Sequence, residues 1–186
     1  PIRNAAQLIR KLAAGEPRLQ SAREIIDRQV IHLSRLVDDL LDVSRITQGK
    51  VTLRKEPIPL NTVVERAIEA TRPLIESRRH RLAVDLSPAP LLIVGDATRL
   101  IQVVANLLNN AAKYTEEGGA ISLRTEAVED CALIRIKDTG LGIAPELLPH
   151  VFELFIQGER SLDRSQGGLG IGLTLVRRLV ELHGGR

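Results

Sequence analysis

The spacing of hydrophobic and polar positions changes near residue 50 of this chain. Before that point, residues 2–14 and 19–48 repeat apolar positions with helical spacing, which predicts two helices. Gly15 and Pro17 lie between them and supply a turn, so the sequence predicts a helical hairpin. A broad apolar stripe follows the second helix and consists of Ile26, Val30, Leu33, Leu36, Val37, Leu40 and Val43. Two helices alone cannot cover such a stripe, so dimerisation is favoured over packing within the chain.

After Gly49 the pattern mixes strand and helix periods and indicates a domain of the α+β class. Strands are predicted at 51–55, 80–86, 93–95, 120–128 and 131–137, the last two as a hairpin around Glu129 and Asp130. Helices are predicted at 60–78 with Pro73 inside, after a capping Asp96, at 145–152 and at 171–183. The chain is therefore divided into two predicted domains, 1–49 and 50–186.

Composition excludes several classes of function. The 186 residues carry 26 Lys and Arg against 23 Asp and Glu, and this net charge of +3 argues against nucleic acid as a partner. One Tyr and two Phe are too few for a base-stacking platform. The single cysteine, Cys131, forms no internal disulfide and suits a reducing, cytoplasmic location. No apolar run approaches the roughly 20 residues of a membrane span, so no membrane contact is expected within this segment.

The helix after Asp96 has two chemically different faces. Leu100, Ile101, Val104, Leu107, Leu108 and Ala111 form the apolar arc, and Arg99, Gln102, Asn106, Asn109, Asn110 and Lys113 form the polar arc. Asparagine is a weak helix former, and Glu or Lys would serve solvent equally well. An amide oxygen binds Mg²⁺ without cancelling its charge, and a nearby lysine can meet phosphates. From this segment alone, a solvated face and a metal site remain equally open.

Two glycine motifs follow downstream. DTGLGI, at 138–143, places an acid at the end of a strand and then two glycines that allow a planar ligand to approach. GGLGIG, at 167–172, comes directly before a helix, where free amide groups attract phosphate. Each motif alone is more often an ordinary turn. Together with the asparagine helix they predict a nucleotide site, and the chain has no Walker A lysine motif.

The order of four motifs resembles that of a known family. NLLNNAAKYT at 106–115, DTGLGI at 138–143, FELF at 152–155 and GGLGIGL at 167–173 are similar to the N, G1, F and G2 boxes of sensor histidine kinases. These kinases are part of the wider Bergerat-fold group of ATP-binding proteins. The resemblance extends over nearly the whole chain. It implies a mixed sheet covered by helices on one face, with ATP and Mg²⁺ as cofactors.

The resemblance also implies a role for individual residues. Asn110 would be the Mg²⁺ ligand with Asn106 beside it, Lys113 and Tyr114 would lie near the phosphates, and Asp138 would hold the adenine amino group. Asn110 and Lys113 would be catalytic. A mobile lid is implied at about 158–168. The remaining nucleotide-binding positions implied are Gly140, Gly142, Ile143, Phe155, Gly168, Leu169, Gly170, Gly172 and Leu173.

Asn106 distinguishes between two reactions. Members of the wider family that hydrolyse ATP carry a glutamate at this position to activate water. An amide is no useful proton acceptor, whereas a positioned base contributes about 10² to 10⁴ in rate. Asn106 therefore favours transfer of the γ-phosphoryl group to a histidine, and then to an aspartate of a response regulator receiver domain.

The 1–49 hairpin resembles the dimerisation and histidine phosphotransfer domain of the same family, which implies a homodimer. None of His32, His80, His150 and His183 matches the pattern of the phosphoacceptor histidine in this family. We therefore expect the acceptor to lie before Pro1 and the closing strands of the catalytic domain to lie beyond Arg186. On this basis the segment should bind nucleotide without phosphorylating itself. A noncatalytic dimerisation scaffold and a serine kinase of the same fold are the alternatives.

Overall fold

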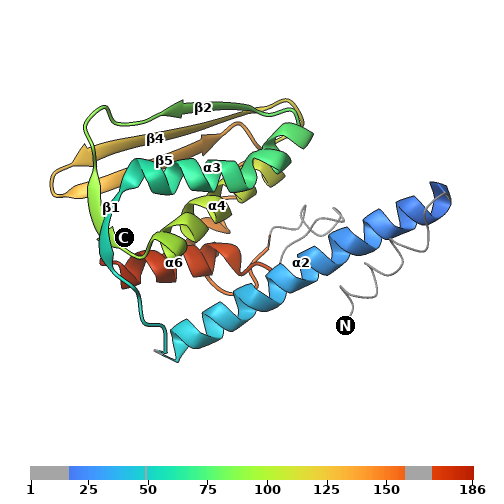
Figure 1. The fold of residues 1–186 in the computed structure, drawn as a ribbon, viewed down its shortest axis with the longest axis horizontal. Coiled ribbons are helices and arrows are strands. Elements are labelled where there is room, and N and C mark those ends of the chain that lie inside the picture. Colours follow the sequence, from blue (N-terminus) through green and yellow to red (C-terminus); the bar gives the residue numbers. More distant parts are fainter. Residues whose placement is uncertain (1–16, 49, 158–168) are drawn as a thin grey trace.

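Two helices, α3 (Leu60–Ser77) and α4 (Ala97–Tyr114), pack on one face of a small mixed β-sheet, and α6 (Gly172–Leu182) packs beside α4 on the side away from the sheet (Figure 1). The computed structural model describes residues 17–48, 50–157 and 169–186. Its elements in chain order are α2 (Pro17–Thr47), β1 (Glu56–Pro59), α3 (Leu60–Ser77), β2 (Arg81–Asp85), β3 (Leu92–Gly95), α4 (Ala97–Tyr114), β4 (Ala120–Val128), β5 (Cys131–Asp138), a 3-10 turn (Leu148–His150) and α6 (Gly172–Leu182). The predicted α+β class, with helices covering one face of a mixed sheet, is confirmed.

The strands form two sheets. In the larger sheet, β4 pairs in parallel with β2 and antiparallel with β5, and the predicted β4–β5 hairpin is confirmed. Ile121 and Leu123 of β4 are each 1% exposed, because alternate residues of a strand point to the same face. The smaller sheet is the antiparallel pair β1 and β3. The register of the hairpin places Asp138, at the end of β5, opposite Ile121.

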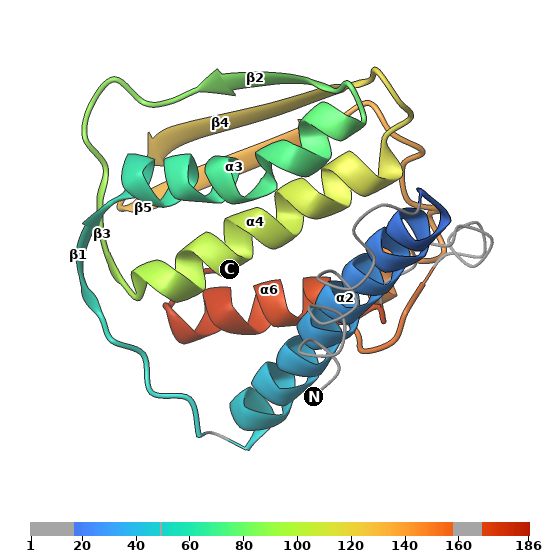
Figure 2. The ribbon, with the colours of Figure 1, turned by 45° about the vertical axis from the view of Figure 1, so that its right-hand side comes forward.

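Helix α4 lies between two hydrophobic cores. Val104, Leu108 and Ala111 pack against α3 and the larger sheet in the first core. On the other side of the same helix, Val103 and Leu107 pack against α6 in the second core. Figure 2 shows the order α3, α4 and α6 across the helical layer. Because α4 contributes to both cores, packing fixes this helix on two sides.

Two predicted elements are wrong. No strand forms at 51–55, and β1 instead begins at Glu56 and includes both prolines of the EPIP segment. An edge strand tolerates proline, since its missing N–H can face away from the single partner strand. No α-helix forms at 145–152, where a 3-10 turn at Leu148–His150 is present. Pro149 has no N–H to donate, and the N–H of His150 donates to the carbonyl of Leu147 at 2.9 Å.

The N-terminal hairpin is described only in part. The second predicted helix is present as α2, and Pro17, predicted to lie in the turn before it, is already helical. The first predicted helix, at 2–14, lies outside the described residues. The hairpin and the division of the chain near residue 50 therefore stay predictions. Within the described ranges, no helix is both long and apolar enough to cross a membrane.

Candidate nucleotide-binding site

The first turn of α4 is fixed by a capping aspartate. Asp96 accepts a hydrogen bond from the N–H of Arg99 at 3.2 Å and another from the N–H of Arg54 at 3.1 Å. Burial alone would raise the pKa of the Asp96 carboxyl, but these backbone hydrogen bonds, one from Thr98 and the charge of Arg99 lower it overall. The N–H of Asp96 donates to Nε2 of His183 at 3.0 Å. The predicted cap is confirmed, and the start of α4 is tied to the end of α6.

The last turn of α4 contacts the DTGLGI motif directly. The N–H of Leu141 donates to the carbonyl of Tyr114 at 3.2 Å. A Cβ atom placed on Gly140 would lie 2.6 Å from the same carbonyl oxygen, so no side chain fits there. Glycine is thus required by the close approach of two backbones rather than by a turn alone. The structure therefore brings the N box and the G1 box together, with Gly140 at the contact.

Asp138 has one oxygen that is used by its own turn. Its Oδ1 accepts a hydrogen bond from the N–H of Gly140 at 2.9 Å. This bond fixes the carboxylate at the end of β5, and the side chain is exposed. The other carboxylate oxygen makes no hydrogen bond to any residue of the described ranges. Gly142 follows with a φ of +68° and an exposed backbone. This arrangement suits a carboxylate that accepts a hydrogen bond from a ligand.

The polar arc of α4 contains amide groups without protein partners. Nδ2 of Asn106 is buried and has no hydrogen-bond partner among the described residues. Asn110 is half-buried, and its side chain makes no hydrogen bond within the same ranges. Lys113 donates to the hydroxyl of Tyr114 at 3.1 Å and lies 4.7 Å from the centre of its ring. Buried amides normally find partners, so these positions fit a bound polar ligand.

The F and G2 boxes also meet. The N–H of Phe155 donates to the carbonyl of Gly170 at 3.2 Å. Gly170 has a φ of +71°, and a Cβ atom there would lie 2.7 Å from the carbonyl oxygen of Ile156. Leu169 is exposed, and Gly172 is the first residue of α6, followed by Leu173. Gly168 and the predicted lid at 158–168 lie outside the described residues. Five of the predicted positions, Phe155, Leu169, Gly170, Gly172 and Leu173, thus lie in the segments that meet where α6 begins.

The residues present fit ATP and Mg²⁺. In the described ranges, no group of three His, Cys, Asp or Glu side chains could hold a metal by itself. A metal at this site would therefore need amide oxygens together with the phosphates of the nucleotide. Asn110 and Asn106 supply such amides, and Asp138 supplies an acceptor for an amino group. The ligand contacts of these residues stay predictions.

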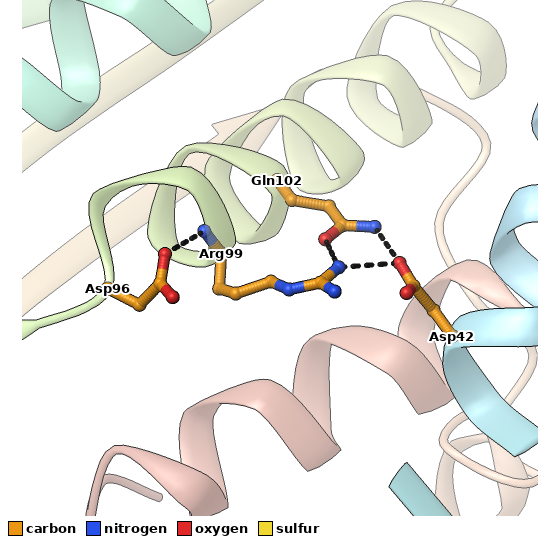
Figure 3. A network of polar contacts seen from close by, with 4 residues as sticks. All are labelled: Asp42, Asp96, Arg99 and Gln102. Carbon is orange, nitrogen blue, oxygen red and sulfur yellow. Dashed lines mark hydrogen bonds and ion pairs between the residues drawn. The ribbon is translucent and has the colours of Figure 1, made fainter. Parts of the chain in front are cut away.

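Sequence reasoning missed a polar contact between α2 and α4 (Figure 3). Asp42 of α2 pairs with Arg99 at 2.6 Å and accepts from Nε2 of Gln102 at 3.0 Å. Arg99 also donates to Oε1 of Gln102 at 2.9 Å. Beside this contact, Val43 and Ile46 of α2 join the second core. The first part of the polar arc thus faces another helix rather than solvent, and α2 lies obliquely across α6 (Figure 2).

We expect the substitution Asp42→Asn to weaken folding in a pH-dependent way. Burial alone would raise the pKa of Asp42, but the hydrogen bonds from Arg99 and Gln102 and the charges of Arg99 and Arg45 lower it overall. A lowered pKa in the folded state stabilises the protein above the unfolded-state pKa, and this contribution disappears as pH falls through the folded value. The free energy of unfolding of D42N should be about 1–2 kcal/mol lower at pH 7.

Urea unfolding of the wild type and D42N at pH 7, 5, 4 and 3 measures this difference. The gap between the two proteins should be constant from pH 7 to 5, begin to narrow below about pH 4, near the unfolded-state pKa, and narrow further as pH falls through the lower folded-state pKa. Asp38→Asn is the matched control, because Asp38 lies one helical turn earlier on α2 and is exposed. A gap of the same size at pH 7 and pH 3 would contradict a role for the Asp42 charge.

The structure describes the side chains of His80, His150 and His183. His80 is 8% exposed, and its Nε2 lies 2.9 Å from the carbonyl of Ala112. His183 bridges Leu179 and Asp96 through its two ring nitrogens. His150 is exposed and pairs with Glu153 at 2.8 Å. His32 lies in α2, but its side chain is outside the described part.

Comparison of sequences relates the chain to histidine kinases. Residues 95–186 match the protein family described as histidine kinase-, DNA gyrase B- and HSP90-like ATPase. The chain is 36% identical to the circadian input-output histidine kinase CikA of Synechococcus elongatus, over 83% of this chain and 21% of CikA. It is 32% identical to the probable sensor histidine kinase TcrY of Mycobacterium tuberculosis, over 99% of this chain and 38% of TcrY. The chain thus spans much less than two thirds of these relatives.

Solved structures give the same relationship. The mycobacterial sensor histidine kinase MprB superposes with a TM-score of 0.60 at 32% identity, over 70% of this chain and 80% of that one. The Acinetobacter baumannii histidine kinase AdeS gives a TM-score of 0.69 at 25% identity, over 96% and 82%. Full-length ShkA in complex with AMPPNP gives 0.74 at 28% identity, over 91% and 35%. The chain belongs to the sensor histidine kinases and contains their ATP-binding catalytic domain.

Proposed function

We propose that this chain binds ATP together with Mg²⁺ and transfers the γ-phosphoryl group to a histidine side chain. The observation that carries the proposal is the contact at the Tyr114 carbonyl, where the asparagine helix meets the loop that follows Asp138. This contact brings two groups of different chemistry to adjoining elements. Asparagine and lysine side chains suit a metal and phosphates, and the Asp138 carboxylate suits the amino group of adenine.

The residues of the site act by binding and orientation. The second oxygen of Asp138 accepts from the adenine amino group, and Gly140 and Gly142 leave room for the base beside the backbone. The oxygen of Asn110 binds Mg²⁺, which neutralises charge on the phosphates when it is bound. Lys113 and Tyr114 lie toward the phosphates, and the G2 residues at the start of α6 bind them through backbone N–H groups. Asp138 therefore selects the base, and α4 orients the phosphates.

The polar arc of α4 favours phosphoryl transfer over hydrolysis. Efficient hydrolysis needs a base that takes a proton from water, and the amide of Asn106 cannot do this. Its Nδ2 group is buried without a partner in the described ranges, so it suits a hydrogen bond to ligand or metal-bound water. Transfer to a histidine imidazole needs positioning and charge neutralisation instead, with ADP as the other product. The acceptor histidine would then pass the phosphoryl group to an aspartate of a response regulator.

The exposed apolar face of α2 supports the proposed homodimer. Leu33, Val37 and Leu40, which belong to the predicted stripe, are 57%, 50% and 46% exposed. Val43 at the end of the same stripe is instead buried against α6. A second copy of α2, with the helix predicted before it, would cover the exposed part and complete a four-helix bundle.

Isothermal titration of this chain with ATP, with and without Mg²⁺, tests the ATP site. We expect ATP to bind about tenfold or more tightly with Mg²⁺ than with a chelator, since a charge-assisted contact contributes about 1.5–3 kcal/mol. Labelling with ATP carrying a radioactive γ-phosphate, of this chain together with a histidine phosphotransfer domain that carries an acceptor histidine, tests the reaction. The label should be lost in acid and kept in alkali, as is typical of phosphohistidine.

Three outcomes would contradict the proposal in different ways. Absence of Mg²⁺-dependent ATP binding would leave a dimerisation scaffold as the better reading. An acid-stable label on the protein would indicate a serine kinase of the same fold. Rapid release of free phosphate without any labelled protein would indicate an ATPase, and Asn106 would then need a different role.

A further inference from the structure

Arg78, just after α3, joins the end of that helix to the end of α4. Its Nη1 donates to the carbonyl oxygens of Ala112, Lys113 and Thr115 at 3.3, 3.0 and 3.2 Å. The last carbonyls of a helix have no partner within the helix, and they carry the negative end of the helix dipole. A guanidinium group, which is positively charged and has several N–H donors, therefore suits the C-terminal end of α4. No sequence motif pointed to Arg78.

Other contacts fix the same segment from the same side. The N–H of Gly118 donates to the carbonyl of Arg78 at 3.0 Å, so Arg78 uses both its backbone and its side chain. His80, two residues later, contacts the Ala112 carbonyl through Nε2 at 2.9 Å. Thr115 is fully buried beneath these contacts. The last turn of α4 is thus held by a charged group in a partly buried place, where water competes weakly for the carbonyls.

The same turn also contacts the proposed base site. In sequence Tyr114 stands between Lys113 and Thr115, and its carbonyl accepts from the N–H of Leu141 in the loop after Asp138. Gly140 approaches the same carbonyl oxygen so closely that no Cβ fits. A shift of residues 112–115 would therefore change the placement of Lys113 relative to Asp138.

We infer that Arg78 is a positioning residue for the nucleotide site. It acts on the ligand through the backbone of α4, because its Nη1 donates to the three carbonyls at the end of that helix. It sets the last turn of α4 so that the phosphate-facing residues Asn110 and Lys113 keep their place relative to the Asp138 loop. The inference rests on the proposed function, since it needs ATP as the ligand of this site.

The test compares two ligands in two matched variants. Arg78→Met keeps the length of the side chain and removes the guanidinium group. Arg79→Met makes the same change at the next residue, whose side chain is 82% exposed and pairs with Glu117 at 3.4 Å. Dissociation constants are measured for Mg²⁺-bound ATP by calorimetry and for adenosine by NMR titration. Circular dichroism and the thermal midpoint establish that each variant is folded at the temperature of measurement.

We expect R78M to bind Mg²⁺-bound ATP about tenfold more weakly, as small misplacements of binding groups do, and adenosine within about twofold of the wild type. The loss falls on ATP because adenosine lacks the phosphates that α4 orients. R79M should match the wild type with both ligands. Arg78→Lys keeps a positive charge but cannot hold three carbonyls equally well, so its ratio of ATP to adenosine affinity should lie between those of the wild type and R78M.

Two results would overturn the inference. One is folded R78M with wild-type affinity for ATP, and the other is an equal loss of ATP and adenosine affinity, which a general weakening of the fold would cause. If R78M does not fold, R78K decides the matter, and an unchanged ratio of the two affinities in R78K overturns the inference. Failure of the wild type to bind ATP would instead contradict the proposed function itself.

Discussion

Substitution of Asp138 by asparagine is expected to weaken ATP binding about 100-fold, the upper part of the range for loss of a charged hydrogen bond. The variant keeps an oxygen that accepts from the N–H of Gly140, which is 2.9 Å from Oδ1 in the wild type. The turn should therefore survive. Because that N–H holds the amide oxygen, the amide NH₂ takes the place of the free carboxylate oxygen. A donor then faces the amino group of adenine, which is also a donor.

The same substitution should reverse the preference between two nucleotides. ITP carries a carbonyl oxygen where ATP carries the amino group, so it can accept from the asparagine NH₂. Calorimetry with both nucleotides in wild type and D138N measures the ratio of the two affinities. Asp130→Asn is the matched control, since Asp130 is exposed in the turn at the other end of β5. A folded D138N protein that still prefers ATP by the wild-type ratio would show that Asp138 does not read the base.

The elements that could be predicted from the sequence are those whose apolar residues follow a helix or strand repeat along their whole length. Helix α4 has a full apolar arc and a capping aspartate, and β4 and β5 alternate around a two-residue turn, so their bounds were close to those observed. The segment 51–55 also alternates, yet the N–H of Arg54 donates to the side chain of Asp96 rather than to a neighbouring strand. Strand formation depends on a partner, and the partner β3 pairs with Glu56–Pro59. The local pattern of apolar and polar residues does not determine which segment pairs with β3.

The sequence predicted which residue types face the ligand. It did not predict the contacts that hold these residues in place. Glycines and an acid in a short motif predict a close approach of backbone, and Gly140 shows that approach at the Tyr114 carbonyl. Asp42 and Arg99 are separated by 57 residues in sequence, and Arg78 lies 34 to 37 residues from the carbonyls that it binds. These contacts between distant residues form because α2, α3 and α4 pack together. The hydrophobic periodicity of a single segment does not predict them. The residues that position a site are therefore harder to predict than those that face its ligand.

Substitution of Asn110 by alanine is expected to remove most of the dependence of ATP binding on Mg²⁺. The amide oxygen of Asn110 is the proposed protein ligand of the metal. Removal of a residue that only hydrogen-bonds to a metal ligand already lowers metal affinity by about 10- to 100-fold. The affinity of N110A for Mg²⁺-bound ATP should therefore fall by about 10- to 100-fold, toward the value that the wild type shows with a chelator. Its affinity for metal-free ATP should be nearly unchanged, because the base contact at Asp138 remains.

Asn109→Ala is the matched control, because Asn109 is the neighbouring residue on the same polar arc and is half-buried like Asn110. Removal of either side chain costs the helix nothing in intrinsic propensity, since alanine is the better helix former. N109A should bind Mg²⁺-bound ATP within about threefold of the wild type, as expected for an amide that makes no ligand contact. If N109A loses the metal dependence and N110A keeps it, the metal ligand is one position earlier, and α4 faces the nucleotide with a different edge of its polar arc. If both variants keep it, amide oxygens of this helix do not hold the metal, and the case for three asparagines in a well-packed helix reduces to a solvated surface.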